Sequence, residues 1–242
     1  MSRRTILALV KATISVALIW FLISRVDMSD LYNRLRRASL AGALLAILLM
    51  AGQSVIAAER WRRVSASMDI VIPFARALRI VLIGLFFNQT LPSSIGGDAV
   101  RVWLTIRDAG RLGKAVNCVL GDRVLALVVL VGLMAATLPL FLSRIDDAHM
   151  KIGIVVVSAA GLSGFAILMA FGDLIVRLLQ RWNVTRPFAE LAADFRGLFL
   201  SPARATLLIG VSLLIHLMTI VMLYVMADAL GIDAPLVDFV IV

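Results

Sequence analysis

The sequence predicts an all-α fold, that of a polytopic helical membrane protein. Of its 242 residues, 62% are hydrophobic and only 16% are charged, and the mean hydropathy is +1.01. A soluble domain is about half apolar and about a quarter charged, so the surplus apolar residues need a bilayer to cover them. Five apolar runs reach the length of about 20 residues that a hydrocarbon core requires. They are residues 5–24, 39–58, 124–142, 152–171 and 205–227.

The first of these runs is predicted to be a retained helix. Arg3 and Arg4 precede it, as basic residues precede a signal peptide. However, the run is long, and no small-residue cleavage site comes before Arg25. We therefore count 5–24 as the first of five full spans.

The third apolar stretch along the chain is different, because residues 78–91 are too short to cross and contain Arg79. Apolar runs of about 10–14 residues are more often re-entrant. A re-entrant hairpin near 78–106 also places 15 Lys and Arg residues on the N-terminal side against 6 on the other. The positive-inside rule favours this asymmetry, and it predicts a cytoplasmic N-terminus, with Arg34, Arg36 and Arg37 outside.

Two later segments complete the expected architecture. Residues 173–204 carry two apolar stripes with arginines between them, which indicates either two amphipathic helices on an anionic cytoplasmic leaflet or a plain cytoplasmic hairpin. Residues 236–242 read as the start of a further helix. We expect a single domain over 1–242, truncated at its C-terminus.

Several functions are excluded by composition and motif. The sequence has no P-loop, HExxH or GxSxG pattern, and two histidines with one cysteine cannot build a familiar zinc site. We therefore expect no enzyme activity, no metal and no cofactor. The basic excess, 24 Lys and Arg against 15 Asp and Glu, belongs in cytoplasmic loops, so no nucleic-acid partner is expected.

The stretch 88–101 holds the candidate site. Pro92 interrupts a helix, Gly96 and Gly97 allow close backbone approach, and Asp98 and Arg101 lie one turn apart. A new helix N-terminus here would suit an anion. The alternative is a structural kink in which Asp98 caps the helix and pairs with Arg101.

Two flanking clusters could add to this site. Arg60 lies in the run Glu59-Arg60-Trp61-Arg62-Arg63, where Trp61 suits a membrane interface and the arginines suit phosphates. Asp122 and Arg123 could complete a charge network with Asp98 and Arg101. In each case an ordinary interfacial anchor is the alternative. His216, alone in mid-helix, is expected to bond to a neighbouring helix rather than to relay protons.

The pattern N-x-x-x-P-S-x-x-G-G-D-x-x-R at 88–101, with Arg60 upstream and Asp122-Arg123 downstream, resembles the lysylphosphatidylglycerol synthase transmembrane region family. The resemblance covers most of the chain. It implies a flippase-like integral protein of the plasma membrane, without the aminoacyl-transfer domain of the fused synthases. The candidate substrate-binding residues are Arg60, Asn88, Pro92, Ser93, Gly96, Gly97, Asp98, Arg101, Asp122 and Arg123.

Three functions follow as hypotheses. The first is translocation of an anionic phospholipid or an isoprenoid-linked lipid, with Gly96 and Gly97 around its phosphate and Arg101 and Arg123 paired with it. The second is a non-transporting partner or regulator of a glycosyltransferase or lipid synthase. The third is a proton-coupled solute transporter that uses Asp98. The expected partners are anionic membrane lipids; the second hypothesis adds such an enzyme, and an oligomer stays open as an alternative.

Overall fold

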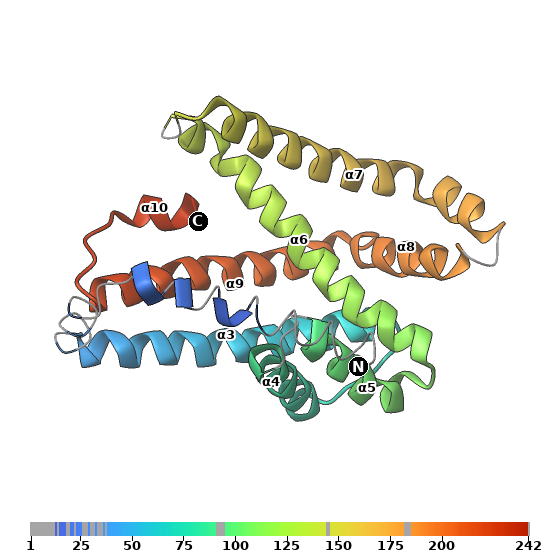
Figure 1. Cartoon of the computed structure of the whole chain (residues 1–242). Coiled ribbons are helices and arrows are strands. Elements are labelled where there is room, and N and C mark those ends of the chain that lie inside the picture. The colour runs from blue at the N-terminus through green and yellow to red at the C-terminus, as the bar shows by residue number, and fades with distance from the viewer. Residues whose placement is uncertain are drawn as a thin grey trace.

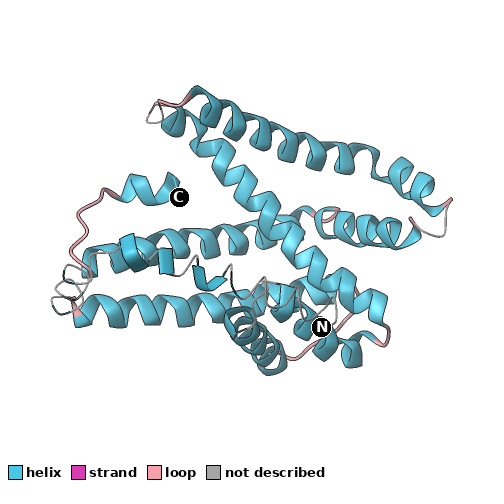
Figure 2. Ribbon diagram, in the orientation of Figure 1, coloured by secondary structure: helices cyan, strands magenta, loops and turns pink. Residues whose placement is uncertain are grey.

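The computed structural model describes residues 38–90, 95–143, 146–181 and 185–241, with isolated positions between 13 and 36. Throughout these residues the regular structure is helical, with no strand (Figures 1 and 2). The helices, in order, are α3 (Leu40–Ser67), α4 (Phe74–Thr90), α5 (Ile95–Ala109), α6 (Leu112–Leu142), α7 (Ala148–Gln180), α8 (Arg186–Phe199), α9 (Pro202–Ala229) and α10 (Leu236–Ile241).

Four of the described helices, α3, α6, α7 and α9, are long and apolar enough to cross a membrane. They contain 28 to 33 residues, which at 1.5 Å per residue corresponds to about 42–50 Å. Each therefore extends beyond a hydrocarbon core of about 30 Å. The predicted spans 39–58, 124–142, 152–171 and 205–227 lie within these four helices. The fifth, 5–24, falls mostly outside the described residues.

Helices α3 and α9 form an antiparallel pair, lying side by side in Figure 1. At one end the Ser39 N–H donates to the Ala229 carbonyl oxygen at 2.9 Å. Gly42 lies so close to Ala229 that a Cβ on Gly42 would come within 2.6 Å of the alanine side chain. Residues 39 and 229 therefore mark the same end of the protein.

Helices α4 and α5 form a hairpin whose two outer ends meet. Arg76, near the start of α4, pairs with Asp108, near the end of α5, at 2.9 Å. Gly110 then turns the chain into α6 with a φ of +72°, a conformation that glycine adopts without steric cost. The hairpin therefore starts and ends at one end of the molecule. Its connecting residues 91–94 lie outside the described part.

The segment 173–204 was expected to form either two helices on a leaflet or a plain cytoplasmic hairpin. Residues 173–180 continue α7, and α8 packs against α6 and α7. Phe195 and Leu198, predicted to face lipid, are at most 2% exposed and belong to the core that includes Trp61 and Leu208. Protein therefore covers these two residues, whereas Leu174, Leu178 and Phe188 of the same segment are at least half exposed. Trp182, which the sequence places at the end of the first apolar stripe, lies outside the described part. The expected start of a further helix is present as α10.

Candidate functional site

A cluster of three arginines and two aspartates lies where α3, α5 and α6 meet, and we call it the charge cluster. Its carboxylates and guanidiniums come from Arg60 on α3, Asp98 and Arg101 on α5, and Asp122 and Arg123 on α6. If all five are charged, one positive charge is in excess. The network expected between Asp98, Arg101, Asp122 and Arg123 is therefore present, and it includes Arg60.

Asp122 is the centre of the charge cluster. One of its oxygens accepts from Nε of Arg60 at 3.0 Å, and the other accepts from an Arg101 nitrogen at 3.2 Å. Asp122 and both arginines are less than 9% exposed. A buried charge is expensive unless it is paired, so this carboxylate keeps two guanidiniums inside the protein. Arg60 also donates to Ser212 of α9 at 3.2 Å.

Arg101 is held on three sides. Its guanidinium stacks 4.2 Å from the ring centre of Trp61, which adds a cation–π attraction to its pairing with Asp122. Gly84 of α4 leaves room for its stem, since a Cβ there would lie 2.7 Å from the Arg101 Cγ. Nε of Arg101 is buried without a hydrogen-bond partner in the described structure. One donor of this arginine is thus unpaired among the described residues.

Asp98 forms its main ion pair with Arg123. It accepts from Nε and from a terminal nitrogen of Arg123, the shorter contact being 2.7 Å, while Arg101 lies 3.7 Å away. The Arg123 side chain is 43% exposed, against 8% for Arg101. Arg123 is therefore the arginine of the charge cluster that an incoming anion reaches most easily.

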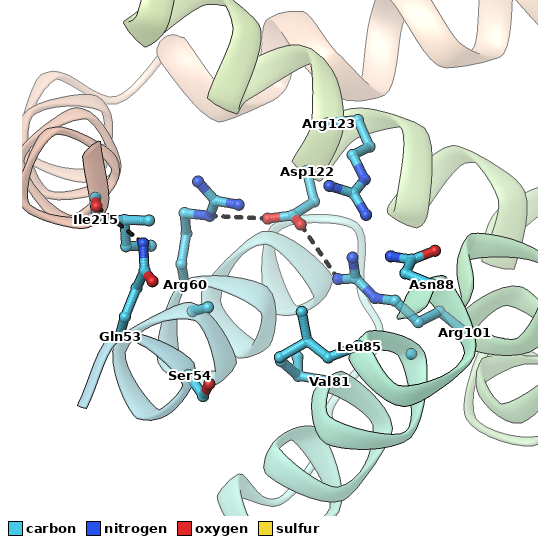
Figure 3. A pocket seen from close by; sticks show the side chains of 12 residues that line it. Gln53, Ser54, Arg60, Val81, Leu85, Asn88, Arg101, Asp122, Arg123 and Ile215 are labelled. Atoms are coloured by element: carbon cyan, nitrogen blue, oxygen red, sulfur yellow. Dashed lines mark hydrogen bonds and ion pairs between the residues drawn. The ribbon is translucent and has the colours of Figure 1, made fainter. Parts of the chain in front are cut away.

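A pocket of about 270 Å³ opens beside the charge cluster (Figure 3). Asp122 lies ten residues inside α6 and Ser212 ten residues inside α9, so this level is about 15 Å from the N-terminal ends of these helices. The lining residues come from α3, α4, α5, α6 and α9: Gln53, Ser54, Ala57, Arg60, Val81, Gly84, Leu85, Asn88, Arg101, Asp122, Arg123 and Ile215.

Gly97 allows a close backbone approach, as expected, but its partner is another helix rather than a phosphate. The Gly97 N–H donates to Oδ1 of Asn88 at 3.0 Å, so it is not available to a phosphate. A Cβ at Gly97 would come within 2.2 Å of the Gly84 carbonyl oxygen. Gly97 therefore allows α4 and α5 to pack closely. Gly96 lies in the first turn of α5, and Pro92 and Ser93 fall outside the described residues.

The run 59–63 does not place Trp61 at a membrane interface, as the anchor interpretation would require. Trp61 is fully buried under Arg101, and Arg62 and Arg63 both pair with Glu59, at 2.8 and 2.6 Å. Within this run, only Arg60 lines the pocket. The helical period explains this, because positions 60 and 61 face the protein while 62 and 63 lie at its edge.

Some pocket residues gave no signal in the sequence. Gln53, Ser54 and Ile215 lie in apolar runs, and only a prediction of which helix faces which could have singled them out. His216 behaves as expected, with its Nε2 3.2 Å from the Ala126 carbonyl oxygen of α6. Among the residues that the structure describes, no three His, Cys, Asp or Glu side chains lie close enough to hold a metal ion.

Comparisons with known proteins point to the family that the sequence motif resembles. The family described as the lysylphosphatidylglycerol synthase TM region matches residues 8–242. A UPF0104 membrane protein, PH1989 of Pyrococcus horikoshii, is 28% identical over 136 residues. That match covers 54% of this chain and 39% of the relative, so it spans about two fifths of the relative's length. No solved structure matches the chain significantly.

The family match covers nearly the whole chain, including every residue of the charge cluster. Together with four helices capable of spanning a membrane, it identifies a multi-pass membrane protein. The chain belongs to the lysylphosphatidylglycerol synthase TM region family.

Proposed function

We propose that this protein moves an anionic phospholipid or an isoprenoid-linked lipid between the leaflets of the plasma membrane, and that the pocket beside the charge cluster holds the lipid phosphate. The observation that carries the proposal is the charge balance of that pocket. Three guanidiniums face two carboxylates, and one guanidinium nitrogen is buried without a partner. A phosphate would supply both the missing charge and the missing acceptor.

The members of the charge cluster have different roles in this proposal. Arg123 and Arg101 contact the phosphate, and Asn88 adds an amide donor. Asp122 positions Arg60 and Arg101, and Asp98 positions Arg123. Pro92, Ser93 and Gly96 are proposed to lie along the path of the lipid; Gly96 is in the first turn of α5, whereas Pro92 and Ser93 lie outside the described residues. These are binding and positioning roles, so we propose transport without a catalytic step.

We also propose that the α4–α5 hairpin re-enters the membrane from the cytoplasmic side. Its outer ends meet at the Arg76–Asp108 pair, and Arg111 of α6 lies 3.6 Å from Glu190 of α8 at the same end. The positive-inside rule makes this basic end cytoplasmic. With 5–24 as a fifth span, the N-terminus is cytoplasmic too. Transporters often hold anionic groups at such broken helices.

The test is lipid movement by the purified chain in liposomes. A fluorescent phosphatidylglycerol is placed in both leaflets, and a membrane-impermeant quencher removes the fluorescence of the outer leaflet only. Lipid movement between leaflets brings the protected inner-leaflet lipid to the quencher. We expect loss of protection with the wild-type protein and with Arg177→Gln, which removes an exposed arginine of α7. We expect at least a tenfold slower rate with Arg123→Gln. Equal rates for Arg123→Gln and the wild type would overturn the proposal.

One observation favours a second function, that of a non-transporting partner of a glycosyltransferase or lipid synthase. Both carboxylates of the charge cluster are already paired with arginines of the protein, which is what a purely structural cluster would also require. No lipid movement by well-folded wild-type protein, with copurification of such an enzyme, would favour this function. A dependence of solute transport on a pH gradient would favour the proton-coupled alternative.

A further inference from the structure

We propose that the pocket also recognises a hydrogen-bond donor on the ligand, a hydroxyl or ammonium group next to its anionic group, and that Gln53 is the residue that recognises it. The proposal rests on the proposed function for the anionic part of the ligand. It adds a second contact on the opposite wall of the same pocket, which determines which polar heads are accepted.

The orientation of the Gln53 amide is fixed by α9. Its Nε2 donates to the Ile215 carbonyl oxygen at 3.1 Å and to the Thr219 hydroxyl oxygen. The Thr219 hydroxyl itself donates to Ile215 at 3.0 Å, so its oxygen is the acceptor for Gln53. A backbone carbonyl only accepts, so the nitrogen of this amide must face α9.

The other branch of the same amide is an acceptor. Because both hydrogens of Nε2 are used, Gln53 offers the pocket its Oε1, for which the described residues provide no recorded partner. Ser54 is similar: its hydroxyl donates to the Met50 carbonyl oxygen at 2.9 Å, which leaves the Ser54 oxygen as an acceptor. Both residues line the pocket. The α3 wall of the pocket therefore accepts hydrogen bonds.

The opposite wall donates. Oδ1 of Asn88 is occupied by the Gly97 N–H, which leaves Nδ2 of Asn88 as a donor. Nε of Arg101 and the guanidinium of Arg123 lie beside it. Figure 3 shows Gln53 and Ser54 on one side of the pocket and Asn88, Arg101 and Arg123 on the other. Each wall thus contains a side-chain amide of which one polar atom is bonded within the protein, the nitrogen in Gln53 and the oxygen in Asn88.

These two walls define the chemistry of the ligand. A phosphate fits the donor wall, and a hydroxyl or ammonium group fits the acceptor wall. The pocket measures about 270 Å³, which leaves room for a head several bonds long. A head with an alkyl end, or a trimethylammonium group, would leave the acceptors unpaired at a cost in affinity.

The experiment measures lipid binding to the purified full chain in detergent by native mass spectrometry, with two matched pairs of lipids. Phosphatidylglycerol and phosphatidylethanol carry the same single negative charge, but only the first has free hydroxyls. Phosphatidylethanolamine and phosphatidylcholine are both zwitterionic, but only the first has N–H groups. We expect the donor-bearing member of at least one pair to bind about fivefold more tightly, as one hydrogen bond contributes. The pair that shows the preference identifies hydroxyl or ammonium.

Variants then assign the preference to Gln53. In Gln53→Leu, we expect phosphatidylethanol binding to persist and the preference to disappear. Ser54→Ala keeps the Gln53 bonds to α9 and should lower the preference about twofold, which carries the test if Gln53→Leu does not fold. Ser163→Ala is the control, because Ser163 makes the same hydroxyl-to-carbonyl bond one turn back on α7, away from the pocket, and its loss should change nothing.

Three results separate the two proposals. Equal binding within both lipid pairs overturns the inference about Gln53, while tight binding of both anionic lipids still supports the proposed function. An unchanged preference in both Gln53→Leu and Ser54→Ala also overturns the inference. Binding of the anionic lipids no tighter than that of phosphatidylcholine contradicts the proposed function itself.

Discussion

Asp98 lies 2.7 Å from Arg123, a residue of another helix, but 3.7 Å from Arg101, one turn along its own helix. In the structural-kink alternative, Asp98 pairs with Arg101, because residues at i and i+3 are neighbours on a helix. The structure instead joins α5 to α6 through Asp98 and Arg123, and it assigns Arg101 to Asp122. The motif and the distant Asp122-Arg123 pair are therefore one unit.

This pairing predicts the result of two charge exchanges. Asp98→Arg with Arg101→Asp should abolish lipid movement, because it places an arginine opposite Arg123 and a carboxylate beside Asp122. Asp98→Arg with Arg123→Asp keeps an ion pair between α5 and α6, so it should be expressed better than either single variant. It should not restore transport, because the exposed guanidinium at position 123 is lost. Lipid movement in liposomes is the measurement. Near-normal transport by the second exchange would reduce Arg123 to a structural role.

Asp122 should be the most costly carboxylate to remove. Asp122→Asn leaves Arg60 buried without its carboxylate and Arg101 with only Asp98, and breaking a buried pair in this way costs about 3–5 kcal/mol. Asp108→Asn is the control, because its pair with Arg76 is more exposed, with side chains 17% and 38% exposed, and is worth about 0–1 kcal/mol. Denaturation in detergent gives both values. A similar loss for the two variants would contradict the central position of Asp122.

Gly97→Ala should destabilise the α4–α5 hairpin. The new Cβ would lie 2.2 Å from the Gly84 carbonyl oxygen and 2.3 Å from Oδ1 of Asn88, so the helices must separate at a cost of about 1–3 kcal/mol. Gly132→Ala is the matched control, since no atom lies within 4 Å of a Cβ there, and it should be neutral or slightly stabilising. Melting temperatures in detergent compare them. Equal stability would argue against close packing at Gly97.

The hairpin also predicts which loops share a compartment. Cysteines introduced as Ala66→Cys and Arg111→Cys should react with an impermeant reagent from one side of the membrane, and Asp233→Cys from the other. Cys118 is fully buried, so it can remain in place. Labelling of positions 66 and 111 from opposite sides would mean that α4 or α5 crosses the membrane.

The fold was predictable where hydropathy alone decides it. The apolar runs 39–58, 124–142, 152–171 and 205–227 all lie in long helices, because an apolar run of about 20 residues has few other options. The role of 173–204 was not predictable in the same way. A stripe such as Phe195 and Leu198 is apolar whether lipid or protein covers it, and only the packing of α8 on α6 and α7 distinguishes the two.

The site was predictable in part for a similar reason. Charged residues in apolar surroundings stand out, so Arg60, Asp98, Arg101, Asp122 and Arg123 were found from the sequence and lie together in the structure. Gly97 was recognised, but its partner across the hairpin was not. Gln53 and Ser54 were missed because their importance comes from α9 and the pocket, which depend on contacts more than 150 residues apart in sequence.

The central claim is that an anionic lipid occupies the pocket beside the charge cluster. Photo-crosslinking tests it most directly, with a photoreactive residue at Leu85, which lines the pocket, or at Leu82, which is similarly exposed on α4 but does not line it. With a headgroup-labelled phosphatidylglycerol, we predict strong labelling at 85 that Arg123→Gln removes, and weak labelling at 82 that Arg123→Gln leaves unchanged. Equal labelling at both positions, insensitive to Arg123→Gln, would contradict the account.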